Sequence, residues 1–331
     1  MTYMENQIQI DLNVTNRCNF NCIHCGFDSG KSNLEDMDLS LAKKILKDFK
    51  SLGGIKVDLT GGEPMLHKDI DKIISYANKL NLRTKLVTNG SLLTEEKLWK
   101  LKQAGLKGIS VSLDGPNYKS FKQTRPETIA VYHRIIKTIK NSVKIGLFTK
   151  INTVIFDYNL YDIEYVVKQA IDLGVHEIRF CFFSPVGRGA NKTEHVADPK
   201  KWLQICRNNL GKYNDKIKIT LEAPIIESHI ECNVDCLAKN ISFLQIFPNG
   251  DAFPCSIMAT YNKPLGNLKY LPLKTFWPNR RKISNRYFKN HIQELFYKYS
   301  GCVNYNFNDL IKSKAYKFVC PCRKFQIKKY K

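Results

Sequence analysis

Three cysteines near the start of the chain have the spacing of a metal-cluster loop. Cys18, Cys22 and Cys25 follow a strand-like segment in the order Cys-x3-Cys-x2-Cys. Three thiolates from one short loop can hold three irons of a cubane and leave the fourth iron open to a small chelating molecule. Zinc is the alternative, but zinc cysteines usually come in Cys-x2-Cys pairs with a fourth ligand nearby, which His24 would have to supply. The spacing favours a four-iron cluster.

The other cysteines and the composition point to an intracellular metal or redox protein. The 331 residues include 11 cysteines, and the N-terminus lacks the basic and apolar segments of a secretory signal. The cytoplasm is then the expected location, where clustered cysteines bind metal more often than they form disulfides. Cys181 and Cys206 stand alone and are predicted to be packed core thiols. The sequence contains no run of eighteen or more apolar residues, which argues against a membrane span.

The chain is strongly basic, with a formal net charge of +22. Most of the basic residues are Lys, and no Arg-rich stripe or basic-aromatic cassette suggests a nucleic-acid surface. Nucleic acid is therefore not expected as a partner, and the charge is interpreted as a solvated surface. An acidic peptide partner would suit the same charge.

The first 183 residues alternate between strand-like and helix-like segments. The strand-like segments are Ile8–Val14, Ile55–Thr60, Arg83–Thr88, Gly108–Leu113, Val143–Thr153 and Glu177–Phe183. The helix-like segments between them are Leu41–Phe49, Ile70–Leu80, Glu95–Ala104, Ile129–Ile139 and Ile163–Leu173. Six such units predict an α/β fold with a partial (βα)6 parallel barrel, because βα repeats wind right-handedly around a parallel sheet. Chemistry in such barrels gathers at the carboxyl ends of the strands.

Capping residues support these boundaries. Ser40, Asp69 and Thr94 stand where helix N-caps belong, and Gly105 and Gly174 where helices end.

The pattern changes after residue 183. Trp202–Leu210 is predicted to be a helix and Ile217–Leu221 a strand, and Phe243–Phe247 and Ala252–Cys255 form a β-hairpin around the Asn-Gly turn signal. The expected organisation is a barrel over residues 1–190, a linker over 191–230 and a small α+β cysteine-rich domain over 231–331.

The cysteine loop resembles that of the radical S-adenosylmethionine (radical SAM) superfamily, and the segment after the second strand extends the resemblance. Gly61-Gly62-Glu63-Pro64 is similar to the family's Gly-Gly-Glu-Pro segment, which binds the methionine amino group. Two glycines permit close backbone approach to a ligand, and a carboxylate suits an ammonium group. The resemblance implies that Cys18, Cys22 and Cys25 ligate a 4Fe-4S cluster to which S-adenosylmethionine binds.

Three further positions match family contacts to S-adenosylmethionine. Asn89 ends the third strand, Ser112 ends the fourth, and Arg125 follows; the last two match residues that contact the methionine carboxylate. Pro126 stands where the family often has glycine after the arginine. Alternatively, the Asp114-Gly115-Pro116 segment is only a turn, and Arg125 makes only an ion pair at the surface. Gly187-Arg188-Gly189 is similar to a turn that is frequent in relatives with appended cluster domains.

The C-terminal region resembles the SPASM and twitch auxiliary modules, through Cys236, Gly250 and Cys255. The resemblance implies one auxiliary 4Fe-4S cluster, with Cys320 and Cys322 as the remaining ligands, because the seven cysteines of a full module are missing. Cys232 or Cys302 is an alternative to one of the last two. Free cysteines in an irregular tail are the other interpretation.

The resemblance implies an oxidoreductase-type enzyme that cleaves S-adenosylmethionine reductively, releasing methionine and a 5′-deoxyadenosyl radical that abstracts hydrogen from a substrate carbon. No protein general base can be identified. Relatives with such modules mostly modify peptides, so a peptide or protein maturase is the leading hypothesis. Ser256 after Cys255 counts against the sulfatase-maturing activity, which typically has Asp there.

The alternatives are oxidation or rearrangement of a small molecule or cofactor precursor, an RNA-directed role, and a non-enzymatic iron–sulfur electron carrier or redox sensor. The expected partners of the enzyme are an external flavodoxin- or ferredoxin-like electron donor and, for a ribosomal peptide, a separate leader-binding protein. The last expectation follows from the early position of Cys18.

Overall fold

The computed structural model describes residues 8–31, 34–221, 243–254, 256, 259 and 264–277. Its strands are β1 Gln9–Thr15, β2 Lys56–Gly61, β3 Arg83–Thr88, β4 Gly108–Ser112, β5 Phe148–Ile155, β6 Glu177–Phe182, β7 Lys218–Leu221, β8 Phe243–Ile246, β9 Asp251–Phe253 and β10 Gly266–Asn267. Its α-helices are α1 Leu39–Ser51, α2 Ile70–Lys79, α3 Glu95–Gln103, α4 Tyr118–Thr124, α5 Ile129–Lys144, α6 Ile163–Asp172, α7 Pro199–Leu210 and α9 Leu273–Phe276. Short 3-10 turns include Pro64–Leu66 and Gly187–Gly189.

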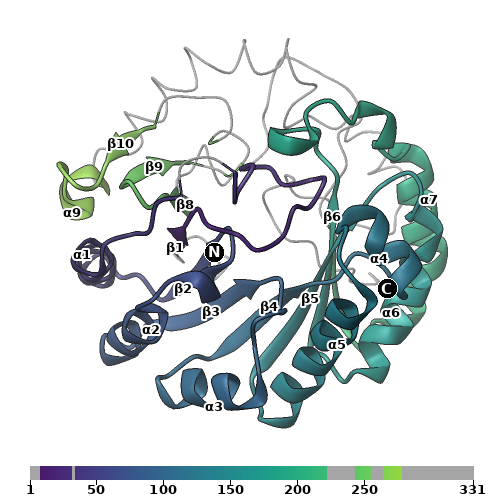
Figure 1. The fold of residues 1–331 in the computed structure, drawn as a ribbon, viewed down its shortest axis with the longest axis horizontal. Coiled ribbons are helices and arrows are strands. Elements are labelled where there is room, and N and C mark those ends of the chain that lie inside the picture. The colour runs from purple at the N-terminus through teal and green to yellow at the C-terminus, as the bar shows by residue number, and fades with distance from the viewer. Residues whose placement is uncertain are drawn as a thin grey trace, which may run out of the picture.

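The strands form one sheet in the order β10-β9-β8-β1-β2-β3-β4-β5-β6-β7. Pairing from β8 through β1 to β7 is parallel throughout, and β8, β9 and β10 are paired antiparallel. Figure 1 shows the sheet curving, with the helices on its outer side and the loop after β1 crossing the open end. The predicted partial parallel barrel is confirmed.

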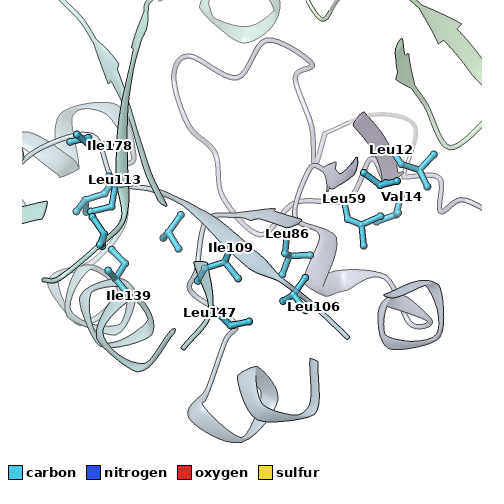
Figure 2. Packing of buried hydrophobic residues seen from close by; sticks show 14 of the residues in the cluster. Leu12, Val14, Leu59, Leu86, Leu106, Ile109, Leu113, Ile139, Leu147 and Ile178 are labelled. Carbon is cyan, nitrogen blue, oxygen red and sulfur yellow. The ribbon is translucent and has the colours of Figure 1, made fainter. Parts of the chain in front are cut away.

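Alternation along each strand separates an apolar outer face from a polar interior. Leu12, Leu59 and Leu86 are fully buried between sheet and helices (Figure 2). On each strand, the residues next to these leucines point to the other side of the sheet, because successive strand side chains alternate. There Lys85 pairs with Asp58 at 2.7 Å. The interior of this barrel is therefore lined by polar and charged groups.

Most predicted element boundaries lie within a few residues of those observed. Thr94 caps α3 by accepting from the Lys97 N–H, whereas Asp38, and not Ser40, caps α1 through the Ser40 N–H. Asp69 stands at the N-cap of α2 without a side-chain cap bond. The predicted strand from residue 143 was too long, because the helical pattern of α5 continues to Lys144 and a turn follows.

Two observed features were not anticipated from the sequence. Helix α4 precedes Arg125, in a stretch where no helix was predicted. The predicted strand over residues 217–221 and the predicted hairpin are both present, but they extend the barrel sheet at its two edges, β7 beside β6 and β8 beside β1. No helix in the described ranges is long and apolar enough to cross a membrane.

Candidate functional site: the cysteine loop

The loop after β1 presents three cysteine sulfurs, each of which accepts one hydrogen bond. The Cys18 sulfur accepts from the Phe20 N–H at 3.4 Å, and the Cys25 sulfur from the Ser29 N–H at 3.4 Å. The Cys22 sulfur accepts from Nη1 of Arg125 at 3.1 Å. Hydrogen bonds to the sulfurs are one of the means by which proteins tune iron–sulfur clusters. The donor set therefore fits a cluster bound through three thiolates.

Burial makes two of these thiols, those of Cys18 and Cys22, costly to ionise without a cation. It raises the pKa of Cys18 to about 12, and it also raises the pKa of Cys22. A metal centre inverts this preference, because a coordinating thiol is deprotonated outright. Among the described residues, no three His, Cys, Asp or Glu side chains are placed so that they could hold a single metal ion.

Arg188 ties the cysteine loop to the turn that follows β6. Its guanidinium donates to Asp28 at 2.6 Å, to the Cys22 carbonyl at 3.0 Å and to the Ser29 carbonyl at 2.7 Å. Its backbone N–H donates to the Cys25 carbonyl at 2.9 Å. The sequence identified Arg188 only as part of a turn, whereas the structure shows that it positions this loop.

The Gly61-Gly62-Glu63 segment lies directly against the backbone of the cysteine loop. The Gly62 N–H donates to the Thr15 carbonyl and the Glu63 N–H to the Arg17 carbonyl, each at 2.8 Å. A Cβ on Gly62 would lie 2.2 Å from the Arg17 carbonyl oxygen. Glycine is required at this position because the two chain segments approach so closely.

The Glu63 carboxylate is fully buried and accepts three hydrogen bonds. Oε1 accepts from the Met65 N–H at 3.1 Å and the Thr88 hydroxyl at 2.8 Å, and Oε2 accepts from the Asn89 N–H at 2.7 Å. Burial nevertheless raises its pKa to about 7, because these donors offset only part of the desolvation. Pro64 starts the 3-10 turn that follows. Glu63 thus joins the loops after β2 and β3.

The other residues predicted to contact S-adenosylmethionine lie around the same open end of the barrel. The Asn89 side chain donates to the Asn19 side chain of the cysteine loop at 2.9 Å and accepts from Ser91. Ser112 ends β4 beside Asn152 of β5 and is half-buried. The fold therefore brings both strand ends to the side on which the cysteine loop lies.

Arg125 is buried among three partners instead of forming a surface ion pair. Its Nε lies 2.8 Å from Oδ2 of Asp114, which is fully buried. Nη2 lies 3.3 Å from Nε2 of His24, in addition to the Nη1 bond to the Cys22 sulfur. The other oxygen of Asp114 accepts from the Val154 N–H at 2.8 Å. The sequence assigned His24 only as the fourth ligand of the zinc alternative and Asp114 only to a turn, because only folding brings both side chains to Arg125.

Aromatic rings flank both sides of the cysteine loop. His24 contacts Phe156 edge-on, with ring centroids 5.6 Å apart, and burial lowers the pKa of His24 to about 4. Phe27 contacts Phe247 edge-on at 5.1 Å, and Phe247 contacts Phe253 at 5.5 Å. The second group connects the cysteine loop to the β8–β9 hairpin.

The predicted auxiliary ligands Cys236, Cys255, Cys320 and Cys322, and the alternatives Cys232 and Cys302, lie outside the described residues. Of the two predicted core thiols, Cys206 is buried. Cys181 is only half-buried, at a β6 position that alternation places inside the barrel.

A parallel α/β barrel with three cysteines on the loop after its first strand defines an iron–sulfur enzyme of the S-adenosylmethionine-cleaving class. The sequence profile of the Radical SAM superfamily matches residues 12–170. The chain belongs to this superfamily, whose members use S-adenosylmethionine and a 4Fe-4S cluster.

Two curated relatives have different functions. The AdoMet-dependent heme synthase of Methanosarcina barkeri is 28% identical over 286 residues, which are 80% of each chain. The GTP 3′,8-cyclase of Clostridium botulinum is 35% identical over 188 residues, which are 54% of this chain and 57% of that protein. The chain therefore covers four fifths of the first relative and less than two thirds of the second.

Solved structures show the same fold at lower identity. Streptococcus suis SuiB bound to S-adenosylmethionine matches with a TM-score of 0.70 at 20% identity, over 82% of this chain and 65% of that chain. The protein anSMEcpe, with bound AdoMet and a Cp18Cys peptide, matches with a TM-score of 0.66 at 17% identity, over 83% of this chain and 81% of that chain.

Proposed function

We propose that this radical SAM enzyme modifies a peptide or protein substrate. The observation that carries the proposal is the extent of the fold likeness. It covers 82% and 83% of this chain, well beyond the 12–170 segment that defines the superfamily, in SuiB and in the peptide-bound anSMEcpe. SuiB has also been solved with the precursor peptide SuiA, and that structure matches this chain with a TM-score of 0.68.

The residues at the open end would divide the work of binding. Cys18, Cys22 and Cys25 would hold the cluster, which together with S-adenosylmethionine supplies the electron and the radical. The main chain at Gly61 and Gly62 would line the methionine end, with Glu63 facing the ammonium group and Ser112 the carboxylate.

The β8–β9 hairpin supports the proposed auxiliary cluster. It is joined to β1, and its aromatic residues Phe247 and Phe253 continue the contact from Phe27 of the cysteine loop. Cys255 follows β9 by two residues in the sequence. An auxiliary cluster ligated by Cys236, Cys255, Cys320 and Cys322 would thus have one ligand close along the chain to this hairpin. A flavodoxin- or ferredoxin-like electron donor remains the proposed partner.

A second candidate is radical oxidation of a small tetrapyrrole precursor. One observation favours it: the likeness to the heme synthase spans 80% of both chains. The two candidates differ in their substrate, and both require cleavage of S-adenosylmethionine.

The enzyme class is tested by the triple variant Cys18→Ala/Cys22→Ala/Cys25→Ala. We expect the purified variant to lose about four irons and to form no 5′-deoxyadenosine with S-adenosylmethionine and dithionite, because these three cysteines are the proposed protein ligands of the barrel cluster. Deoxyadenosine formation at the wild-type rate would refute the cluster assignment.

The substrate is tested by adding two kinds of compound to the reconstituted wild-type enzyme. One is each short peptide encoded beside its gene, and the other is a set of tetrapyrrole haem precursors. We expect a peptide mass change, with stoichiometric deoxyadenosine, measured by mass spectrometry. A converted tetrapyrrole with unchanged peptides would instead establish the second candidate.

A further inference from the structure

We propose that Arg125 raises the reduction potential of the cluster bound by Cys18, Cys22 and Cys25, by donating a hydrogen bond to the sulfur of Cys22. The inference concerns the barrel cluster alone and is independent of the substrate. It assigns Arg125 a role that is distinct from contact with the methionine carboxylate of S-adenosylmethionine.

The geometry makes this bond a strong one. Nη1 of Arg125 lies 3.1 Å from the sulfur, within a buried environment in which both residues are less than one tenth exposed. Burial strengthens the interaction of a charged donor, because water neither competes for the sulfur nor screens the charge. Of the three hydrogen bonds that described residues make to the sulfurs of this loop, it is the one from a cation; the Phe20 and Ser29 donors are neutral amides.

The guanidinium is also held in place. Asp114 lies 2.8 Å from Nε, and Asp114 is itself fixed by the Val154 N–H of β5. Arg125 is the C-cap of helix α4, so its backbone position is set by a regular element packed through the fully buried Phe121. The arrangement is a planar fork between a carboxylate and a sulfur, a geometry that the point charge of lysine cannot reproduce.

The electronic consequence has a definite sign. Reduction adds one electron to the cluster, and a donor to a ligating sulfur stabilises the added negative charge. Losing the donor therefore lowers the potential. The cluster would then be harder to reduce, and S-adenosylmethionine would be cleaved more slowly with a weak donor.

The test is an EPR-monitored redox titration of the holoenzyme without S-adenosylmethionine, comparing wild type with Arg125→Lys. The barrel signal is identified as the one missing from the triple cysteine variant. Lysine keeps the charge opposite Asp114 but loses the fork. We expect a tenfold smaller ratio of reduced to oxidised cluster at a given potential, a shift of about 59 mV for a one-electron couple.

A second variant covers the case in which Arg125→Lys does not fold. Asp114→Asn/Arg125→Gln removes both charges together, so the net charge of the site is unchanged, and we expect a shift in the same direction. Arg17→Lys is the matched control, because the Arg17 guanidinium lies beside Cys18 in sequence but bonds Asp36 and the Leu66 carbonyl instead of a sulfur.

An unchanged potential in a folded variant with full iron content would overturn the proposal. An equal shift in Arg17→Lys would also overturn it, because the effect would then come from any disturbance of the loop. Weaker binding of S-adenosylmethionine with an unchanged potential would return Arg125 to the role of a carboxylate ligand alone.

Discussion

Glu63 is a fully buried residue that joins two loops of the fold and that we propose to face the ammonium group of a ligand. Its carboxylate accepts three hydrogen bonds from the loops after β2 and β3, and burial still raises its pKa to about 7. The ionised carboxylate of Glu63 is therefore destabilised in the free enzyme. The ammonium group of a bound ligand would stabilise the ionised carboxylate, because an opposite charge nearby favours ionisation.

The raised pKa of Glu63 predicts a pH dependence of stability. The folded protein binds this proton more tightly than the unfolded chain, so stability contributed below about pH 4.5 is lost as the pH rises to about 7. The loss amounts to about 3 kcal/mol, at roughly 1.4 kcal/mol for each pKa unit. Glu63→Gln cannot titrate, so its free energy of unfolding should change less between pH 5 and pH 7.5 than that of wild type. If urea unfolding gave the same change in free energy between the two pH values for wild type and for Glu63→Gln, the assignment would be contradicted.

At the scale of elements, the cysteine loop is held by the turn after β6. Gly187 has a φ of +55°, and a Cβ there would lie 2.1 Å from the Gly26 carbonyl oxygen. The turn therefore fits against the loop only with glycine at this position. This close approach places the Arg188 guanidinium on the Cys22 and Ser29 carbonyls.

Gly187→Ala is expected to weaken the hold of the loop on its cluster. The methyl group must push the turn away from Gly26 and lengthen the Arg188 bonds, each worth about 1.5–3 kcal/mol because the donor is charged. Iron should be lost to a chelator about tenfold faster, the change that about 1.4 kcal/mol produces. Gly53→Ala is the control, because Gly53 also has a positive φ, of +82°, but a Cβ there meets nothing within 4 Å. Equal iron loss from both variants would indicate backbone strain as the cause.

At the scale of the whole molecule, the barrel and the segment after residue 242 share one sheet. β8 pairs with β1 over four residues, with Leu244 and Ile246 fully buried, and Gln245 bonds Asn13. Phe276 and Trp277 are buried in the same core. Without this segment, β1 would become an unpaired edge, which is a hazard for aggregation.

Two truncations are predicted to behave differently. A chain ending at Trp277 should stay monodisperse, keep about four irons and still cleave S-adenosylmethionine, because the first cysteine loop and its supports remain, whereas the proposed ligands Cys320 and Cys322 are lost. A chain ending at Leu221 should aggregate, because the β1 edge is uncovered. Size-exclusion chromatography and iron analysis would measure both. A soluble, iron-loaded chain ending at Leu221 would show that the hairpin does not support the barrel.

Sequence was sufficient for the parts of this protein that local pattern determines. The period of the apolar residues located the barrel strands, and the Cys-x3-Cys-x2-Cys spacing, with Gly61-Gly62-Glu63, identified the family. Capping was less certain: Ser40 and Asp38 are equally good cap residues by type, and only backbone geometry chose Asp38.

Tertiary structure decided which distant side chains meet. Arg125 and Cys22 are 103 residues apart, and Arg188 and Cys22 are 166 apart, so no local pattern could predict either contact. The attachment of β8 to β1 likewise joins segments more than two hundred residues apart. The sequence by itself determined the chemistry of the loop, because the number and spacing of thiolates select the metal centre. The supports of that loop depend on the fold, since hydrogen bonds and buried ion pairs form only where packing brings their partners together.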